Sequence, residues 1–225
     1  IQSAHGTAHN CFVSGTIEDS LRLGFGSITE RLDQALGTLQ MCGGIGYDFS
    51  TLRPRGSLIK TLNTYSGGPL PFMSIFDAAC KCISAAGHRR GAQMGVLRVD
   101  HPDIEEFIHA KQTLGVLEAF NISIAITDEF MRAVEAGTEF WLRFNGENIR
   151  KIDARALWET IMRSTWDWGE PGVIFIDRIN RMNNLWYCET IAATNPCFTE
   201  DTRVWTAGFG HVPFRDLVGR SVEVL

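Results

Sequence analysis

Apolar residues along most of this chain follow two alternating patterns: short continuous runs, and segments in which they recur every three or four positions. The clearest helical segment begins at Ser27-Ile28-Thr29-Glu30, which has the form of a capping box, and its apolar stripe continues to Leu39. We expect it to end at Gly43-Gly44, where the next apolar run starts. The same patterns predict further helices over residues 72–83, 102–111, 128–136 and 153–168, and strands over residues 9–13, 44–49, 94–99, 120–126, 140–144 and 173–176.

Repeated alternation of strands and helices at this spacing favours parallel pairing through right-handed crossovers, so the predicted fold class is α/β. Residues 51–68 are rich in Arg, Pro, Ser, Thr and Gly and are predicted to form a surface loop. The pattern changes near the end of the chain. Residues 202–206 alternate as in a β-strand, and Gly208 to Gly210 indicates a turn.

The composition is that of an ordinary globular protein, with 225 residues, 44% of them hydrophobic, and a net charge of −5. This charge argues against a general nucleic-acid binder but permits a small anionic substrate. No apolar run reaches the roughly 18 residues that span a bilayer, and no secretion signal is evident. We therefore expect a cytoplasmic protein with no membrane partner. The start at Ile1, without an initiator methionine, indicates a fragment.

The six cysteines do not have the dense spacing of a secreted disulfide scaffold. Cys80 and Cys82 lie two positions apart in a predicted helix, where side chains diverge by about 200°, so both are expected to be packing residues rather than metal ligands. His5 and His9 have the spacing of helical metal ligands, but no third ligand is evident and Gly6 lies between them. No metal site is predicted.

Two glycine-containing segments are open to a functional interpretation. Gly43-Gly44-Ile45-Gly46 follows a helix and opens a strand, which is the reverse of the dinucleotide-binding order. These glycines either stop the helix and form a turn, or they allow the sugar or phosphate of a substrate to approach the backbone. Arg89 and Arg90, between Gly87 and Gly91, are either a solvated loop or a cationic cover over a nucleotide.

An ordered series of motifs spans residues 1 to about 196. The motifs are Asn10-Cys11-Phe12-Val13, Ile17-Glu18-Asp19-Ser20, Gly43-Gly44-Ile45-Gly46, Leu52-Arg53-Pro54-Arg55-Gly56, Arg89-Arg90-Gly91-Ala92 with Met94-Gly95, His101-Pro102-Asp103-Ile104 and Asn195-Pro196-Cys197. Together they resemble the large, catalytic subunit of ribonucleotide reductases, and the wording is most similar to the adenosylcobalamin-dependent class. A class I large subunit with a separate radical-generating subunit is the alternative.

The resemblance implies that residues 1–196 form the first half of a ten-stranded α/β barrel. It implies reduction of ribonucleotides to deoxyribonucleotides by a thiyl radical, with adenosylcobalamin as the cofactor. The implied partners are a ribonucleotide substrate, a nucleoside triphosphate effector, a thioredoxin-like or glutaredoxin-like reductant, and a second copy of the chain in a homodimer. A fragment that only binds nucleotide, without chemistry, is a further alternative.

The resemblance also implies roles for single residues. Cys11 matches one member of the family's redox thiol pair. A thiol pair suits this reduction because it can donate two electrons and form a disulfide reversibly. Asn195 and the position of Cys197 match the amide and the radical cysteine of an Asn-x-Cys-x-Glu motif. Asn10 and Gly44, together with Cys11 and Asn195, match positions that contact the substrate. Without the resemblance, Cys11 would more often be a core thiol.

The implied effector site comprises Asp19 and Arg53, and Arg89 lies in the loop that relays the effector signal. Considered without the resemblance, Asp19 precedes a helical region and would be its N-cap.

The resemblance to a reductase stops at Cys197, where the family motif should continue Cys-Gly-Glu but the chain continues Phe198-Thr199-Glu200. Residues 197–225 instead resemble the N-terminal end of an intein, which predicts the β start of a Hint domain. Cys197 would then be the splicing nucleophile, whose thiol attacks the Pro196 carbonyl in an N-to-S acyl shift. The host's radical cysteine would be the first residue after the intein.

The intein segments Thr-x-x-His and terminal His-Asn are missing from residues 198–225. We therefore expect the chain as it stands to have neither reductase nor splicing activity. A self-splicing module that carries residues 1–196 as passive cargo is the remaining alternative.

Overall fold

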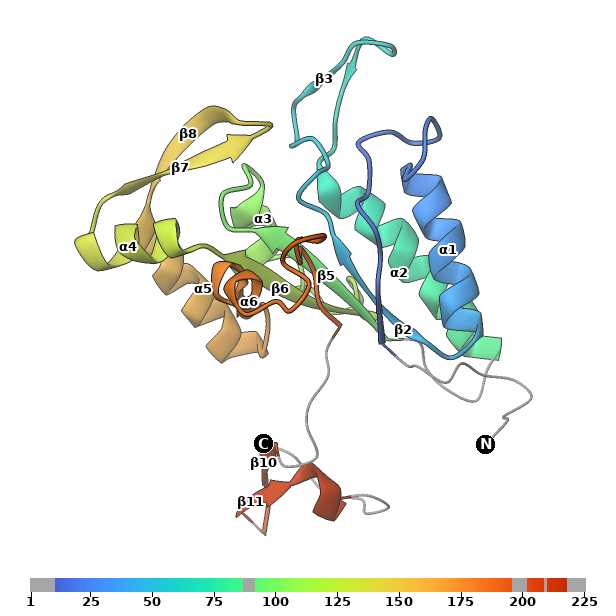
Figure 1. Cartoon of the computed structure of the whole chain (residues 1–225), viewed down its shortest axis with the longest axis vertical. Helices are drawn as coiled ribbons and strands as arrows, with labels where there is room; N and C mark the ends of the chain where they lie inside the picture. Colours follow the sequence, from blue (N-terminus) through green and yellow to red (C-terminus); the bar gives the residue numbers. More distant parts are fainter. Residues whose placement is uncertain (1–10, 87–91, 196–201, 209, 218–225) are drawn as a thin grey trace. The chain divides into compact units, whose positions relative to one another are not determined.

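The computed structural model describes residues 11–86, 92–195, 202–208 and 210–217. The chain divides into two compact units, Ile1–Asn195 and Pro196–Leu225 (Figure 1). The first unit is built on a five-stranded sheet with the order β1-β2-β5-β6-β9, in which every neighbouring pair is parallel. Its strands are β1 (Cys11–Val13), β2 (Gly44–Asp48), β5 (Gln93–Arg98), β6 (Phe120–Ile126) and β9 (Gly172–Phe175). The predicted α/β class with parallel pairing is confirmed.

The sheet strands occur in the same order in space as along the chain, and each is joined to its neighbour by a crossover that contains at least one helix. The described helices are α1 (Ile28–Gln40), α2 (Pro69–Ala86), α3 (Ile104–Ile108), α4 (Asp128–Ala136), α5 (Ala154–Trp168) and α6 (Ile176–Arg181). The helix expected over residues 102–111 is shorter than predicted, and the short helix α6, directly after β9, was not predicted.

Helix α1 begins as its sequence predicts. The Ser27 hydroxyl caps the helix by accepting a hydrogen bond from Glu30 N at 3.4 Å, and the Glu30 carboxylate accepts one from Gly26 N at 2.6 Å. The predicted helical region after Asp19 is wrong, so Asp19 is not an N-cap. Gly24 and Gly26 have φ angles of 87° and 84°, which a right-handed helix excludes.

The C-terminal end of α1 also differs from the prediction. The helix ends at Gln40 rather than at Gly43-Gly44, and the residue that turns the chain is Cys42, with a φ of 63°. Gly44 and Gly46 lie within β2, so a helix stop does not account for them.

Two hairpins lie outside the parallel sheet. The strand predicted over residues 140–144 belongs to an antiparallel hairpin of β7 (Glu139–Phe144) and β8 (Glu147–Asp153). Its two-residue loop is Asn145-Gly146, with φ angles of 49° and 79°, the conformation for which this dipeptide is selected. The predicted loop over residues 51–68 contains a smaller hairpin of β3 (Leu58–Ile59) and β4 (Thr64–Tyr65).

The main hydrophobic core lies between one face of the sheet and the helices. At its centre the rings of Tyr47, Phe49, Phe76 and Phe120 meet at centroid distances between 5.0 and 6.1 Å. Cys80 is buried in this core as predicted, whereas the expectation for Cys82 is wrong because it is exposed on the other side of α2. A smaller cluster covers the opposite face of the sheet and contains Met94, Val96, Ala125, Ile176 and Ala193.

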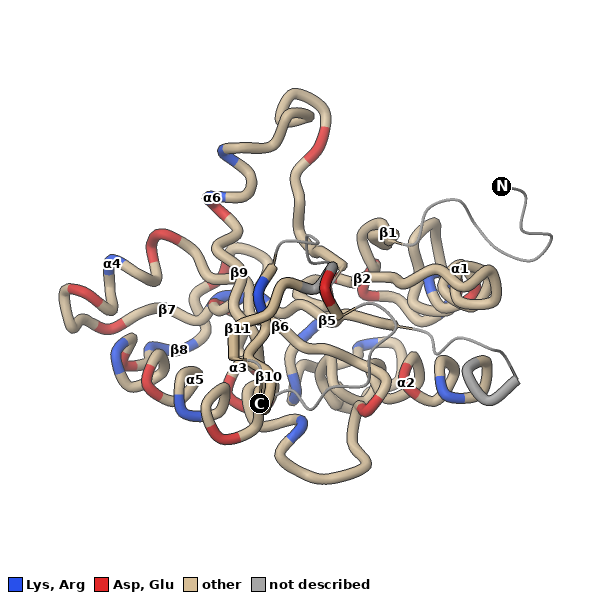
Figure 2. Tube along the Cα trace, turned by 90° about the horizontal axis from the view of Figure 1, so that it is seen from below, with Lys and Arg blue, Asp and Glu red and all other residues tan. Residues whose placement is uncertain are grey.

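Charged residues of both signs are interspersed along the described parts of the chain (Figure 2). No helix among the described residues is long and apolar enough to cross a membrane. The second unit contains an antiparallel hairpin of β10 (Arg203–Thr206) and β11 (Gly210–Pro213), followed by a 3₁₀ helix, η1 (Phe214–Leu217). Its predicted β pattern is confirmed, and the Thr206 hydroxyl closes the turn by donating to Gly210 O at 3.0 Å.

Tyr47 provides a test of the core. Its hydroxyl donates to Gln93 Oε1 at 2.9 Å, and burial raises the pKa of this hydroxyl far above its usual range, so it remains a donor. Tyr47→Phe should lower the free energy of unfolding by about 1–3 kcal/mol, because Gln93 Oε1 would lose its buried partner. Urea unfolding measures the change, with Tyr65→Phe as the exposed control. Equal losses in the two variants would show that the buried hydrogen bond contributes nothing.

Candidate functional site

Three of the predicted site residues meet at the amino ends of β1 and β2. Cys11 is an exposed, free thiol whose Cα pairs with that of Gly44 across the two strands. Asn195, the last residue of the first unit in the sequence, donates a hydrogen bond from Nδ2 to Phe12 O at 3.4 Å. A Cβ atom built on Gly44 would lie only 3.0 Å from this same Nδ2 atom. The structure therefore places a thiol, a bare strand backbone and a carboxamide side by side.

The glycines of β2 have a structural reason that the sequence did not show. A Cβ atom at Gly46 would lie 2.1 Å from the Thr194 carbonyl oxygen, closer than any real contact. Thr194 also directs its hydroxyl to the Met94 sulfur at 3.6 Å. The backbone that comes close to these glycines is thus the chain's own segment before Asn195.

The predicted effector residues Asp19 and Arg53 also lie together. Arg53 Nε donates to Asp19 Oδ2 at 2.7 Å, and Arg53 donates a second, longer hydrogen bond to Asp19 O at 3.3 Å. Both side chains are about 30% exposed, so the pair stays accessible to a ligand. Asn10, Arg89 and Cys197, the other predicted site residues, lie outside the described residues.

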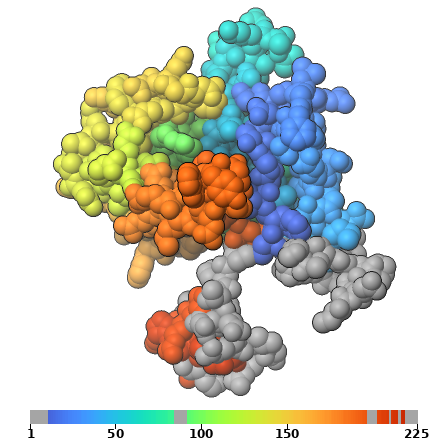
Figure 3. Space-filling model, in the orientation of Figure 1, coloured from blue at the N-terminus to red at the C-terminus, as the bar shows by residue number. Residues whose placement is uncertain are grey.

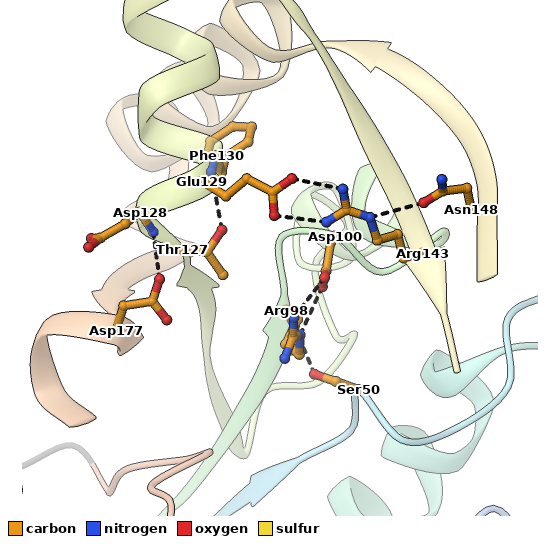
Figure 4. A network of polar contacts seen from close by, with 10 residues as sticks. All are labelled: Ser50, Arg98, Asp100, Thr127, Asp128, Glu129, Phe130, Arg143, Asn148 and Asp177. Carbon is orange, nitrogen blue, oxygen red and sulfur yellow. Dashed lines mark hydrogen bonds and ion pairs between the residues drawn. The ribbon is translucent and has the colours of Figure 1, made fainter. Parts of the chain in front are cut away.

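A polar network that the sequence did not predict occupies the carboxyl ends of the parallel strands (Figure 4). Arg98, at the end of β5, makes a two-point contact with Asp100 at 2.7 and 2.9 Å. Arg143 from β7 contacts Glu129 in the same way at 2.7 and 2.8 Å, and this contact lowers the pKa of Glu129. The Arg143 backbone donates to Asp100 O at 2.6 Å. Strand β5, helix α4 and the β7–β8 hairpin are therefore tied together.

A cavity of about 410 Å³ opens beside this network. Its lining residues are Asp48, Ser50, Thr51, Arg98, Asp100, His101, Arg143, Phe144, Asn145 and Gly146. The two guanidinium groups already hold carboxylates, so the charges in the cavity wall are largely balanced. Among the described residues no group of three or more His, Cys, Asp or Glu side chains could hold a metal ion, and the cavity gives no sign of a metal centre.

The comparison with known families shows to which family the ordered motifs of residues 1–196 belong. The family described as "Ribonucleotide reductase, barrel domain" matches residues 9–204, which is most of the chain. The chain belongs to the ribonucleotide reductase family. The parallel sheet with its strands in sequential order agrees with the barrel domain.

Named relatives of this reductase chain cover it to different extents. A vitamin B12-dependent ribonucleoside-diphosphate reductase of Mycobacterium tuberculosis (strain CDC 1551 / Oshkosh) is 40% identical over 195 residues, which are 85% of this chain and 28% of that protein. The protein of the same name from Thermoplasma acidophilum is 39% identical over 159 residues, 69% of this chain and 21% of the relative. The chain thus spans only about a quarter of the length of these relatives.

A viral relative extends further along the reductase chain. The ribonucleoside-diphosphate reductase large subunit of Invertebrate iridescent virus 6 is 27% identical over 235 residues, which cover 98% of this chain and 23% of the viral protein. Because residues 197–225 make up more than a tenth of the chain, this alignment includes most of them. The mycobacterial alignment covers 85% of the chain, so it cannot include the whole of residues 1–196 together with the whole of residues 197–225.

His101, in the reductase motif His101-Pro102-Asp103-Ile104, has a structural role. Its Nδ1 atom accepts from Asp103 N at 3.1 Å, so Nε2 carries the hydrogen that is donated to Leu52 O at 3.0 Å. The ring is 2% exposed, and burial lowers its pKa. Burial also raises the pKa values of Asp48 and Asp103. The neutral imidazole therefore joins the loop after β2 to the start of α3.

The buried neutral ring predicts a loss of stability in mild acid. Because the folded-state pKa of His101 lies below its value of 6.5 in the unfolded chain, the unfolded state takes up the proton first as the pH falls. The free energy of unfolding should therefore fall from neutral pH towards about pH 5, and less so in His101→Gln. Raised carboxyl pKa values act in the opposite direction, so the difference between the two proteins isolates the histidine.

Denaturant unfolding at several pH values measures this difference. His109→Gln, which alters an exposed ring, is the matched control and should follow the wild-type pH profile. Parallel profiles for the wild type and His101→Gln would contradict the prediction.

Proposed function

We propose that this chain supplies the first half of the catalytic barrel of an adenosylcobalamin-dependent ribonucleotide reductase. The observation that carries the proposal is the meeting of Cys11, Gly44 and Asn195 at the amino ends of β1 and β2. Both relatives near 40% identity are named vitamin B12-dependent enzymes, whereas the large-subunit viral relative is 27% identical. These identities favour the cobalamin class over class I.

In this proposal the described residues bind, orient and reduce. The Asn195 carboxamide holds ribose hydroxyls beside the bare backbone of Gly44, and Asn10, which lies outside the described residues, is proposed as a further substrate contact. Cys11 is one of two thiols that are oxidised to a disulfide while the ribose C2′–O bond breaks and water leaves. The second thiol comes from the rest of the reductase.

The thiol and carboxamide suit a thiyl-radical reaction, and the cobalamin would supply the radical to a cysteine at the Asn195-Pro196-Cys197 motif. No described residue is assigned to hold the cobalamin itself. A thioredoxin-like or glutaredoxin-like protein would restore the thiol pair, in an enzyme expected to be cytoplasmic.

The Asp19–Arg53 pair supports an effector site for a nucleoside triphosphate. The guanidinium, fixed by two contacts to Asp19, keeps further N–H groups for phosphate oxygens. We include Arg89 in this proposal, because the family resemblance assigns it to the loop that relays the effector signal, and we include a second copy of the chain as the partner in a homodimer.

We further propose that residues 197–225 begin an intein whose splicing nucleophile is Cys197. Two observations support this: the compact unit that starts at Pro196, and the β hairpin within it. Residue 196 is then the last reductase residue before the Hint domain. The family match, however, runs past Cys197 to residue 204.

The reductase proposal predicts deoxyribonucleotide formation by the full-length protein that contains this chain, when adenosylcobalamin, a dithiol and a ribonucleotide are added. The 225-residue chain alone should form none, and Cys11→Ser should abolish multiple turnover in the full-length protein. Cys82→Ser, which removes an exposed thiol on α2, should keep the wild-type rate. Wild-type turnover in Cys11→Ser would refute the assignment of Cys11.

The intein proposal is tested in the full-length precursor. Cys197→Ala should block formation of the ligated, shortened reductase, because alanine cannot form the thioester. Cys188→Ala removes an exposed thiol nine positions earlier in the sequence and should leave splicing unchanged. Mass spectrometry of the products distinguishes the two variants. Accumulation of shortened reductase from the Cys197→Ala precursor would show that Cys197 does not begin an intein.

A further inference from the structure

The segment that delivers Asn195 to the sheet has no regular secondary structure of its own. Residues 189–195 form neither helix nor strand. Backbone groups in such a segment need partners from side chains or from water. At Ile191 both partners come from one side chain: Asn180 Nδ2 donates to Ile191 O at 2.9 Å, and Asn180 Oδ1 accepts from Ile191 N at 2.8 Å.

The Asn180 carboxamide is itself held in place. Its Nδ2 atom also donates to Ile176 O at 3.0 Å, one turn earlier in α6. Ile176 is 9% exposed and packs in the cluster with Met94 and Val96 on the sheet. Helix α6, which contains Asn180, follows strand β9 without a loop. The carboxamide therefore belongs to a helix that is joined directly to the sheet.

Downstream of Ile191 the segment makes close contacts at Ala193, Thr194 and Asn195. Ala193 is 2% exposed and packs against the same cluster, and the Thr194 carbonyl fits over Gly46. Asn195 lies four positions after Ile191, at most about 14 Å of extended chain. Figure 3 shows the orange α6 region lying against the blue N-terminal segment that contains β1. A shift of the backbone at Ile191 should therefore also move Asn195, because few residues between them could compensate for it.

We propose that Asn180 is a positioning residue that sets the path of residues 191–195 and thereby places Asn195 beside Cys11 and Gly44. This inference rests on the reductase function proposed above. A carboxamide is required because it donates and accepts at the same time. Aspartate keeps the acceptor for Ile191 N but directs negative charge at Ile191 O, and the similarly shaped leucine satisfies neither group.

Hydrogen exchange in the 225-residue chain tests the contact directly. Asn180→Leu should speed exchange of the Ile191 amide about tenfold, because one hydrogen bond of ordinary strength is lost. Asn180→Asp should show a smaller increase, since the acceptor remains. Arg178→Ala, on the exposed side of the same helix, is the matched control and should leave this amide unchanged. Unaltered Ile191 exchange in a folded Asn180→Leu chain would overturn the proposal.

Kinetics of the full-length reductase test the consequence. In Asn180→Leu, kcat per folded enzyme should fall about 10- to 100-fold, because small misplacements of reacting groups are this costly. Binding of a nucleoside triphosphate, measured by calorimetry, should stay unchanged. Gly46→Ala places a methyl group against the Thr194 carbonyl, so it should displace the same segment and lower kcat similarly. Gly37→Ala, which adds a methyl group in open space, should leave kcat unchanged. Asn180→Asp should retain more activity than Asn180→Leu.

The two arms separate the inference from the function on which it rests. A wild-type full-length protein without reductase activity would overturn the proposed function, and the exchange of the Ile191 amide would still decide whether Asn180 holds the segment. An active wild type with undiminished kcat in folded Asn180→Leu would overturn the positioning role alone.

Discussion

Two glycines in strand β2 lie against the segment that ends at Asn195, and the arrangement of the predicted substrate residues depends on this close approach. A Cβ atom at Gly46 would meet the Thr194 carbonyl oxygen at 2.1 Å, and one at Gly44 would meet the Asn195 carboxamide at 3.0 Å. A parallel sheet requires cover on both faces. Helices α1 to α5 cover one face, and on the other helix α6 packs beside a segment with no regular structure that lies directly on the glycine backbone. This close approach brings a residue from the far end of the unit next to Cys11.

The parallel strands separate two kinds of chemistry. At their amino ends lie a thiol, a bare backbone and a carboxamide, groups that carry no formal charge when the thiol is protonated. At their carboxyl ends lie paired guanidinium and carboxylate groups, with Arg98 and Arg143 each held by two contacts. Paired charges of this kind fix neighbouring elements through geometry more than through net energy. The network thus holds the β7–β8 hairpin at one end of the sheet, away from the thiol.

Sequence periodicity predicted the strands and helices of the sheet because each buries an apolar face, and burial leaves a regular pattern. It missed features that depend on single residues. Asn145-Gly146 turns the chain back on itself, so the strand over residues 139–144 pairs with its neighbour in a hairpin rather than with the parallel sheet. Gly24 and Gly26 prevent the helix that was expected after Asp19. Both signals were present in the sequence as local turn chemistry.

The candidate site shows a different limit of sequence reasoning. Motif order was enough to choose Cys11, Gly44 and Asn195, but nothing along the sequence shows that Asn195 lies over β2, because that contact joins residues far apart in the chain. The role of Asn180 is invisible for the same reason: an asparagine near the end of a short helix has many uses. What distinguishes this one is that its carboxamide satisfies both backbone groups of Ile191. The Asn180 carboxamide makes the two hydrogen bonds with Ile191 that a neighbouring strand would otherwise make. It fixes the irregular segment at Ile191 alone, so its effect on Asn195 depends on the short, tightly packed path from Ile191 to Asn195.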